Sequence, residues 1–281
     1  MPRVGVCALC HRDDQELQNS HFLPAGVYRA TRDGTQDNPN PLTLNDDAVF
    51  QNSKQISDHL LCRQCEERLN KNGEHWFLAH CCRKNQFPPA SLLDGVPPVG
   101  SSTRIMLYHA SQISKINVAA LTYFAASMFW RASVHRWKSG GTECRGIALG
   151  PYEERLRRFL LGETTFPQNC VLWVSVPVDI TPFASLSLTP YGGRKDGYHV
   201  YKLVVLGVGF HLLVGRRIPR EALAMCFLSG PGNPIYRTDM LEEGIIQDVH
   251  HKFDLHPQLL VGPKGGRSRY SDASSESSFS R

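Results

Sequence analysis

Two pairs of cysteines form the clearest chemical pattern in this 281-residue sequence. Two residues separate Cys7 from Cys10, and two separate Cys62 from Cys65, so each pair can present two thiolates from one tight turn. Zinc takes four ligands in a tetrahedron, and two such knuckles therefore predict a closed structural zinc site. The 51 residues between Cys10 and Cys62 exceed the roughly 15 to 20 of a compact zinc ribbon, which predicts a long insertion between the knuckles.

Other residues close to the knuckles also have zinc-binding side chains. His11 follows the first knuckle, and His80, Cys81 and Cys82 follow the second, so each is a substitute for one of the four ligands. The nine cysteines are odd in number and no export sequence precedes them, which argues against a disulfide framework. Because metal-bound thiolates contribute folding free energy directly, we expect at least residues 1–85 to lose their structure without zinc.

A wider set of residues resembles the zinc-stapled branch of the HNH, or ββα-metal, endonucleases. The resemblance covers about residues 4–80 and rests on three segments: Cys7-Ala-Leu-Cys10, Ser20-His21-Phe-Leu-Pro24 and Leu61-Cys62-Arg-Gln-Cys65. In that family a hairpin places a catalytic histidine near a second, catalytic metal, and the two knuckles staple the fold. The resemblance thus implies a treble-clef-like module that hydrolyses phosphodiesters.

The same resemblance implies roles for two side chains. His21 matches the family's general base, a neutral imidazole that takes a proton from water. The residue before that base is usually an Asp or His ligand of the catalytic metal, whereas this chain has Ser20, a poor ligand. Glu66 stands where a His or Asn usually follows the second knuckle, and its carboxylate suits Mg²⁺ or Mn²⁺ because hard cations prefer oxygen. A structural role for His21, as a hydrogen-bonded ring beside Pro24, is the alternative.

Charge does not mark the cysteine region as a surface for nucleic acid. The net charge is +5, but residues 1–85 hold 10 Lys and Arg against 11 Asp and Glu, so the basic excess lies later in the chain. There, a predicted helix carries Arg131, His135 and Lys138 at spacings of four and three, which places them on one side. We take this basic face as the candidate nucleic-acid contact, with a solvated edge of a buried helix as the alternative.

The elements that position these groups are predicted from periodicity and turn composition. The first knuckle lies between a short strand and a return strand over 17–23, and the second leads into a helix interrupted at Asn72-Gly73. A long and largely buried helix and a shorter one follow, and then strands rich in Val, Leu and aromatic residues. These later elements are helices over 114–137 and 151–162 and strands over 171–178 and 200–214.

Together these elements predict an α+β protein in which a zinc-bound, treble-clef or HNH-like module precedes a mixed helical and β domain. Four prolines and two glycines between residues 86 and 100 indicate a connection between the two. The predicted divisions are the zinc module over 1–85, the Pro-rich connection over 86–104, a domain of unassigned role over 105–262 and a disordered tail over 263–281.

The leading hypothesis is a metal-dependent endonuclease of HNH-like type that hydrolyses DNA or RNA, by analogy in bacterial defence. The alternative is a non-catalytic zinc protein that binds nucleic acid or a protein partner through the same module. The sequence has no phosphate-binding loop and no Gly-x-Ser-x-Gly elbow, so neither a nucleotide site nor a serine hydrolase is indicated. Its longest apolar stretch, 116–130, is shorter than the roughly 18 residues that suggest a membrane span, and we expect a cytoplasmic protein.

Overall fold

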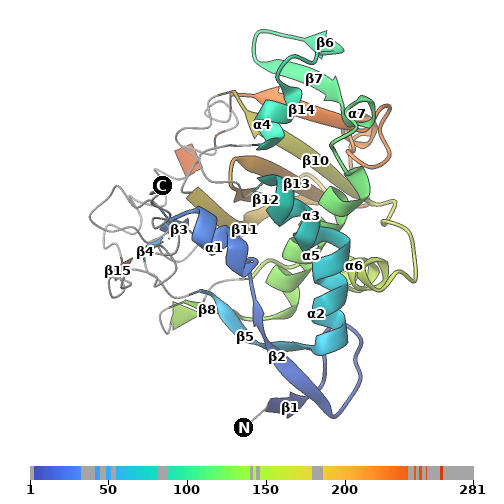
Figure 1. Ribbon diagram of the computed structural model, residues 1–281. Helices are drawn as coiled ribbons and strands as arrows, with labels where there is room; N and C mark the ends of the chain where they lie inside the picture. The colour runs from blue at the N-terminus through green and yellow to red at the C-terminus, as the bar shows by residue number, and fades with distance from the viewer. Residues whose placement is uncertain are drawn as a thin grey trace, which may run out of the picture.

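A computed structural model of the chain combines helices with β-sheets, which confirms the expected α+β class (Figure 1). Among the described residues the strands form a three-stranded sheet, a ten-stranded sheet and a two-stranded ribbon. No helix within these residues is long and apolar enough to cross a membrane. The structure describes residues 3–32, 42–44, 49–51, 55–81, 88–139, 142–143, 146–178, 186–239, 244, 247–248, 251 and 260–261.

The small sheet and the helices next to it form the N-terminal unit. Its strand order is β1-β2-β5, with antiparallel pairing throughout, and β2 confirms the predicted return strand. Strand β5 runs directly into α2, so the second knuckle lies at a strand-to-helix junction. The bounds of these elements are β1 (Arg3–Gly5), β2 (Gln15–His21), α1 (Ala25–Ala30), β5 (Ser57–Cys62) and α2 (Arg63–Leu69).

The helix that follows the second knuckle is continuous, which corrects the predicted interruption at Asn72-Gly73. Helix α2 passes through a π-helical turn, η1 (Asn70–Glu74), into α3 (His75–Cys81). Gly73 is needed there for packing, because a Cβ atom at this position would lie 2.7 Å from the backbone nitrogen of Phe124. The glycine that was predicted to interrupt the helix thus lies where η1 packs closely against α5.

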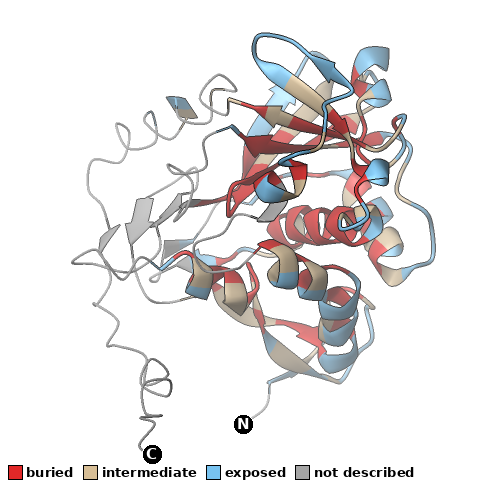
Figure 2. Ribbon diagram, turned by 45° about the horizontal axis from the view of Figure 1, so that its top comes forward, coloured by how far each residue is buried: buried red, intermediate tan, exposed pale blue. Residues whose placement is uncertain are grey.

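Helix α5 (Val118–Val134) is the centre of the molecule and is buried on nearly every side (Figure 2). Its first turn is capped by Asn117, whose side-chain oxygen accepts a hydrogen bond from the backbone N–H of Ala120 at 2.9 Å. The helix ends three residues before the predicted end at Trp137, because His135 takes an extended conformation. Both ribbon views show α5 between the N-terminal unit and the large sheet.

The large sheet has the strand order β15-β4-β3-β11-β12-β13-β10-β14-β7-β6. The predicted strands over 171–178 and 200–214 are confirmed as β10 and as the hairpin of β12 and β13. Strands β3 and β4 come from the region before residue 85 yet belong to this sheet. The strands are β3 (Leu42–Leu44), β4 (Val49–Gln51), β6 (Gly100–Ser101), β7 (Ile105–His109), β10 (Cys170–Pro177), β11 (Leu186–Lys195), β12 (Tyr198–Val205), β13 (Val208–Gly215), β14 (Pro234–Thr238) and β15 (Leu260–Val261).

One apolar core joins the N-terminal unit, α5 and the large sheet. Phe77 of α3 stacks on Phe124 of α5 with ring centroids 3.8 Å apart, and Phe124 lies 6.0 Å from Phe210 of β13. The predicted helix over 151–162 is confirmed as α6, which begins at a proline and ends before a left-handed glycine. The remaining elements are α4 (Pro88–Leu93), η2 (Ala110–Gln112), β8 (Lys138–Ser139), β9 (Thr142–Glu143), α6 (Pro151–Leu161) and α7 (Arg220–Ala224). The predicted disordered tail lies outside the described residues.

Candidate metal centre and adjoining pocket

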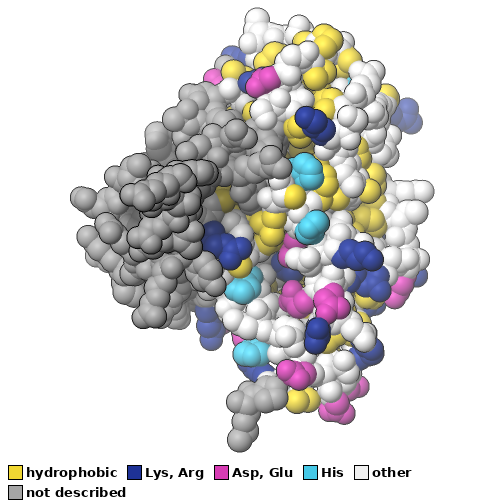
Figure 3. Space-filling view, viewed as in Figure 1, with side chains coloured by type: hydrophobic (Ala, Val, Ile, Leu, Met, Phe, Trp, Pro, Cys, Tyr) yellow, Lys and Arg dark blue, Asp and Glu magenta, His cyan; other side chains and the backbone are white. Residues whose placement is uncertain are grey.

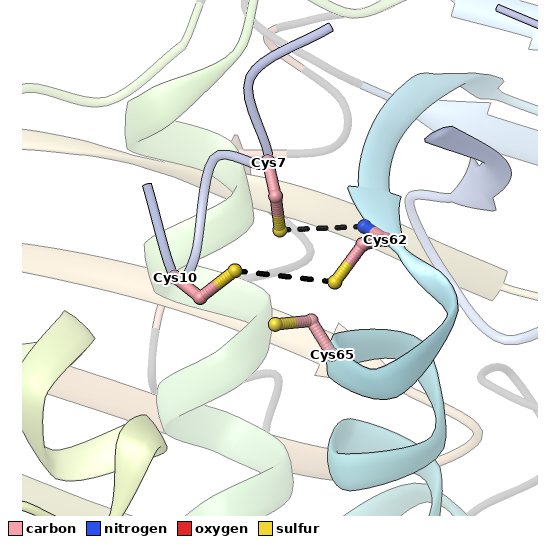
Figure 4. Close-up of side chains that lie close together, drawn as sticks. All are labelled: Cys7, Cys10, Cys62 and Cys65. Carbon is pink, nitrogen blue, oxygen red and sulfur yellow. Dashed lines mark hydrogen bonds between the residues drawn. The ribbon is translucent and has the colours of Figure 1, made fainter. Parts of the chain in front are cut away.

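The four predicted zinc ligands lie together, and their sulfur atoms point toward a common centre (Figure 4). All four Sγ atoms lie within 4.8 Å of one another. The Sγ atoms of Cys10 and Cys62 are 3.9 Å apart, close to the roughly 3.8 Å expected for two sulfurs bound to one tetrahedral zinc ion. The cluster therefore fits a structural metal ion such as zinc.

The backbone around the first knuckle explains why the thiols converge. His11 has a positive φ of 56°, which turns the chain back on itself, and its N–H donates to the carbonyl oxygen of Cys7 at 2.9 Å. The backbone N–H of Cys62 donates to the Sγ atom of Cys7 at 3.3 Å and so ties the two knuckles together. Cys62 is the last residue of β5, and Cys65 lies in the first turn of α2. The strand-to-helix junction thus determines the positions of the second pair of thiols.

Electrostatics around the cluster favour a thiolate at Cys7. Hydrogen bonding from Cys65 lowers the pKa of Cys7 to about 4, and the same contact raises the pKa of Cys65. Without a cation the four sulfurs therefore share protons and cannot all ionise. The Arg12 guanidinium donates to the Sγ atom of Cys10 at 3.3 Å and to that of Cys62 at 3.8 Å. Its positive charge offsets part of the negative charge that a zinc ion with four thiolates carries.

The substitute ligands do not join this cluster within the part of the chain that the structure describes. The Nδ1 atom of His80 lies 2.8 Å from the carbonyl oxygen of Trp76, and the two rings stack. Cys81 is buried at the end of α3, and Cys82 lies outside the described residues. His11 contributes to the turn of the first knuckle through its backbone, which has a positive φ.

A polar pocket of about 250 Å³ lies between α1 and the helix that carries the second knuckle, and Glu66, the residue after Cys65, is among those that line it. It brings together three side chains that the sequence analysis named separately, His21, Glu66 and Arg131. It also contains Asn70 and Glu74, which sequence reasoning did not select. The spacing of four residues from Glu66 to Asn70 and again to Glu74 is the pattern that would have revealed them.

Arg131 forms the floor of the pocket and is almost completely buried, with 1% of its side chain exposed. Its Nη2 atom lies 2.8 Å from Oε1 of Glu74 and 3.8 Å from Oε2 of Glu66. Its Nη1 atom donates to the carbonyl oxygen of Phe22 at 3.3 Å, so α5 is also fixed to the end of β2. This arginine holds two carboxylates of the N-terminal unit from the direction of the core.

Ser20, which replaces the usual metal ligand of the HNH pattern, serves the hairpin. It is buried, and its hydroxyl oxygen accepts a hydrogen bond from the backbone N–H of Leu61 at 3.2 Å. The hydroxyl also donates to the carbonyl oxygen of Gln18 at 3.4 Å. Ser20 is not among the residues that line the pocket.

The three basic residues predicted to share a helix face do not do so, because α5 ends at Val134. Arg131 points into the molecule and pairs with carboxylates. The Nε2 atom of His135 lies 3.0 Å from Oδ2 of Asp58, and Lys138 belongs to β8. A nucleic-acid contact by these residues stays a prediction, without the common face on which it was based.

The visible surface of the N-terminal unit carries both signs of charge (Figure 3). Asp and Glu side chains are interspersed with Lys, Arg and His over the lower half of this face, around α2, β2 and β5. This mixture agrees with the nearly balanced charge of residues 1–85.

Comparisons with protein-family models, with curated proteins and with solved structures gave no match to this chain. Fold and site define an α+β protein with a four-cysteine cluster that can bind a metal. Any activity therefore has to be argued from the chemistry of the site.

Proposed function

We propose that this protein is a metal-dependent nuclease of HNH-like type, with its active site in the pocket beside the cysteine cluster. One observation carries the proposal: His21 and Glu66, far apart in the sequence, line the same pocket. The HNH resemblance had named these two residues as general base and metal ligand. A single pocket that holds both side chains is what such an activity requires.

The order of the N-terminal elements supports a treble-clef-like arrangement. A first knuckle is followed by the antiparallel pair of β2 and β5, and then by a helix with the second cysteine pair at its start. His21 is the last residue of β2, which pairs with β5, and Glu66 follows Cys65 on α2, so a metal bound by the four cysteines would hold the helix directly and the strand through β5.

The side chains of the pocket suit phosphodiester hydrolysis. The imidazole of His21 would take the proton of the attacking water. Glu66 would help to hold Mg²⁺ or Mn²⁺, and such an ion, when bound, polarises phosphate and stabilises the leaving oxygen. Arg29, exposed at the rim, would bind a phosphate of the substrate by charge. Arg131 is a positioning residue, because it contacts the carboxylates of Glu66 and Glu74 from the side of the core.

The inward position of Ser20 favours the second candidate, a non-catalytic zinc protein that binds nucleic acid or a protein partner. Its hydroxyl is engaged by Leu61 and Gln18 and offers the pocket no ligand. A module with this departure would keep the zinc-dependent fold without hydrolysis, and binding to nucleic acid would then weaken as salt rises.

A plasmid-nicking assay with Mg²⁺ or Mn²⁺ separates the two candidates. We expect the zinc-loaded protein to nick DNA or cut RNA, and His21→Ala to lower the rate by about 100-fold at unchanged zinc content. His75→Ala is the matched control, since His75 is exposed on α3 and does not line the pocket. Equal rates for His21→Ala and the wild type, or no cleavage by either, would rule out the nuclease.

A further inference from the structure

The π-helical turn gives the pocket a straight row of oxygen-bearing side chains. Glu66, Asn70 and Glu74 follow one another at intervals of four residues. In a regular α-helix four residues overshoot a full turn by about 40°, so such a row drifts around the helix. The wider π turn over Asn70–Glu74 turns less per residue and opposes that drift. All three side chains therefore line the same pocket.

Buried polar atoms without hydrogen-bond partners meet in this pocket. Among the described residues these atoms are Oε1 of Glu66, Oε1 of Glu74 and Nε of Arg131. The Glu74 side chain is only 9% exposed, and its short approach to Arg131 lacks the alignment of a hydrogen bond. Buried polar atoms are paired in the great majority of cases, so Oε1 of Glu66, to which the described residues offer neither a hydrogen bond nor an ion pair, indicates a missing partner.

The charges identify the kind of partner. Two carboxylates face one guanidinium, and its Nη2 atom is 2.8 Å from Glu74 but 3.8 Å from Glu66. Arg131 thus compensates Glu74 closely and Glu66 less closely, while Arg29, the other cation that lines the pocket, is exposed at its rim, so a cation bound beside Glu66 would stabilise the two carboxylates. Carboxylate and amide oxygens are the ligands of hard divalent cations, and a pocket of about 250 Å³ has space for such an ion with some of its water.

We propose that Glu74 is a direct ligand of one divalent cation, together with Glu66 and the amide oxygen of Asn70. Arg131 holds the two carboxylates in place and limits the charge of the empty site. The site belongs to the pocket of the proposed nuclease and deepens that proposal by naming its ligands. Cation binding itself does not require His21 or catalysis, so the two proposals can fail separately.

The test is Mn²⁺ binding to the full-length, zinc-loaded protein, followed by electron paramagnetic resonance and by calorimetry. We expect one Mn²⁺ per chain, and a dissociation constant at least tenfold higher in Glu74→Gln and in Glu66→Gln. Glu67→Gln is the control, because Glu67 is exposed on the same helix and pairs with Arg63 at 2.9 Å. No Mn²⁺ bound by the wild type, or equal binding by Glu74→Gln, would overturn the proposal.

A second variant keeps the test decisive if Glu74→Gln does not fold, as judged by circular dichroism. Glu74→Asp retains the negative charge opposite Arg131 but withdraws the carboxylate by one methylene group. It should weaken Mn²⁺ binding at least threefold, and unchanged binding would contradict a ligand role. His21→Ala should bind Mn²⁺ like the wild type. If the wild type binds Mn²⁺ but cleaves no nucleic acid, the cation site is supported and the nuclease proposal is wrong. If the wild type cleaves nucleic acid but its Mn²⁺ binding does not depend on Glu74, the nuclease proposal is supported and the proposed cation site is wrong.

Discussion

The N-terminal unit and the large sheet are stabilised by different forces. Strands β10 and β13 are buried along almost their whole length, whereas β1 has no buried residue and β2 has one. Figure 2 shows the same contrast, with buried residues concentrated in α5 and the large sheet. Because a small layer buries too little apolar surface to be stable alone, we expect the unit to depend on a metal bound by its four cysteines and on packing against α5.

This difference explains where the polar pocket lies. A region cross-linked by a metal would be able to keep Glu66 partly buried and Glu74 buried without a large apolar core of its own. The core contributes Arg131 from α5, which contacts both carboxylates. The candidate site thus lies at the border, where the apolar core supports the polar groups of the N-terminal unit.

Zinc removal should have the largest effect and should separate the two regions. Chelation, or Cys62→Ser, is expected to destabilise the N-terminal unit by more than about 5 kcal/mol, because structural zinc contributes its binding free energy to folding. Hydrogen exchange should then lose protection in β2, β5 and α2 while β10, β12 and β13 stay protected. Metal analysis of the intact protein should find one zinc ion per chain.

The control for this experiment is Cys226→Ser, at a buried cysteine outside the cluster. It should lower stability modestly and leave the zinc content unchanged. Uniform loss of protection in both regions on chelation, or no zinc in the purified protein, would show that the proposed division is wrong.

The sequence predicts those parts of the molecule that depend on local patterns. Four cysteines at fixed spacing are enough for the cluster, and a proline and a glycine mark both ends of α6. Arg131 shows what a local pattern cannot predict. Its spacing along the helix suggested a polar side, whereas its side chain pairs with Glu66 and Glu74, which are distant in the sequence. Nothing near Val134 in the sequence indicates that α5 ends there, and Gly73 reveals its role only beside Phe124.

Gly73→Ala should have the second largest effect, because it acts where the two regions touch. The added methyl group would lie 2.7 Å from the backbone nitrogen of Phe124 and 2.9 Å from its Cα atom, and backbone atoms cannot move aside as a flexible side chain can. Overpacking of this kind costs about 2 kcal/mol, with the urea midpoint lowered accordingly. Gly193→Ala is the control, since a Cβ atom there meets nothing within 4 Å. Equal midpoints for both variants would contradict close packing of η1 on α5.

Acid should act on the large sheet through His211 of β13. Burial is the main cause that lowers its pKa to about 4, and the positive charge of Lys202 adds to this. The unfolded chain, with a histidine pKa of about 6.5, binds the proton more readily, so stability falls as the pH drops from 6.5 toward 4. At pH 5 the loss is about 2 kcal/mol, which His211→Leu should abolish.

Thiolate protonation also releases zinc in acid, so hydrogen exchange has to be read separately for each region. If His211→Leu restores acid resistance to β12 and β13 while β2 and β5 still lose protection with zinc, the two regions respond to acid through different groups. If the pH dependence of protection in β13 is unchanged in the variant, the acid sensitivity of the large sheet also depends on the loss of zinc.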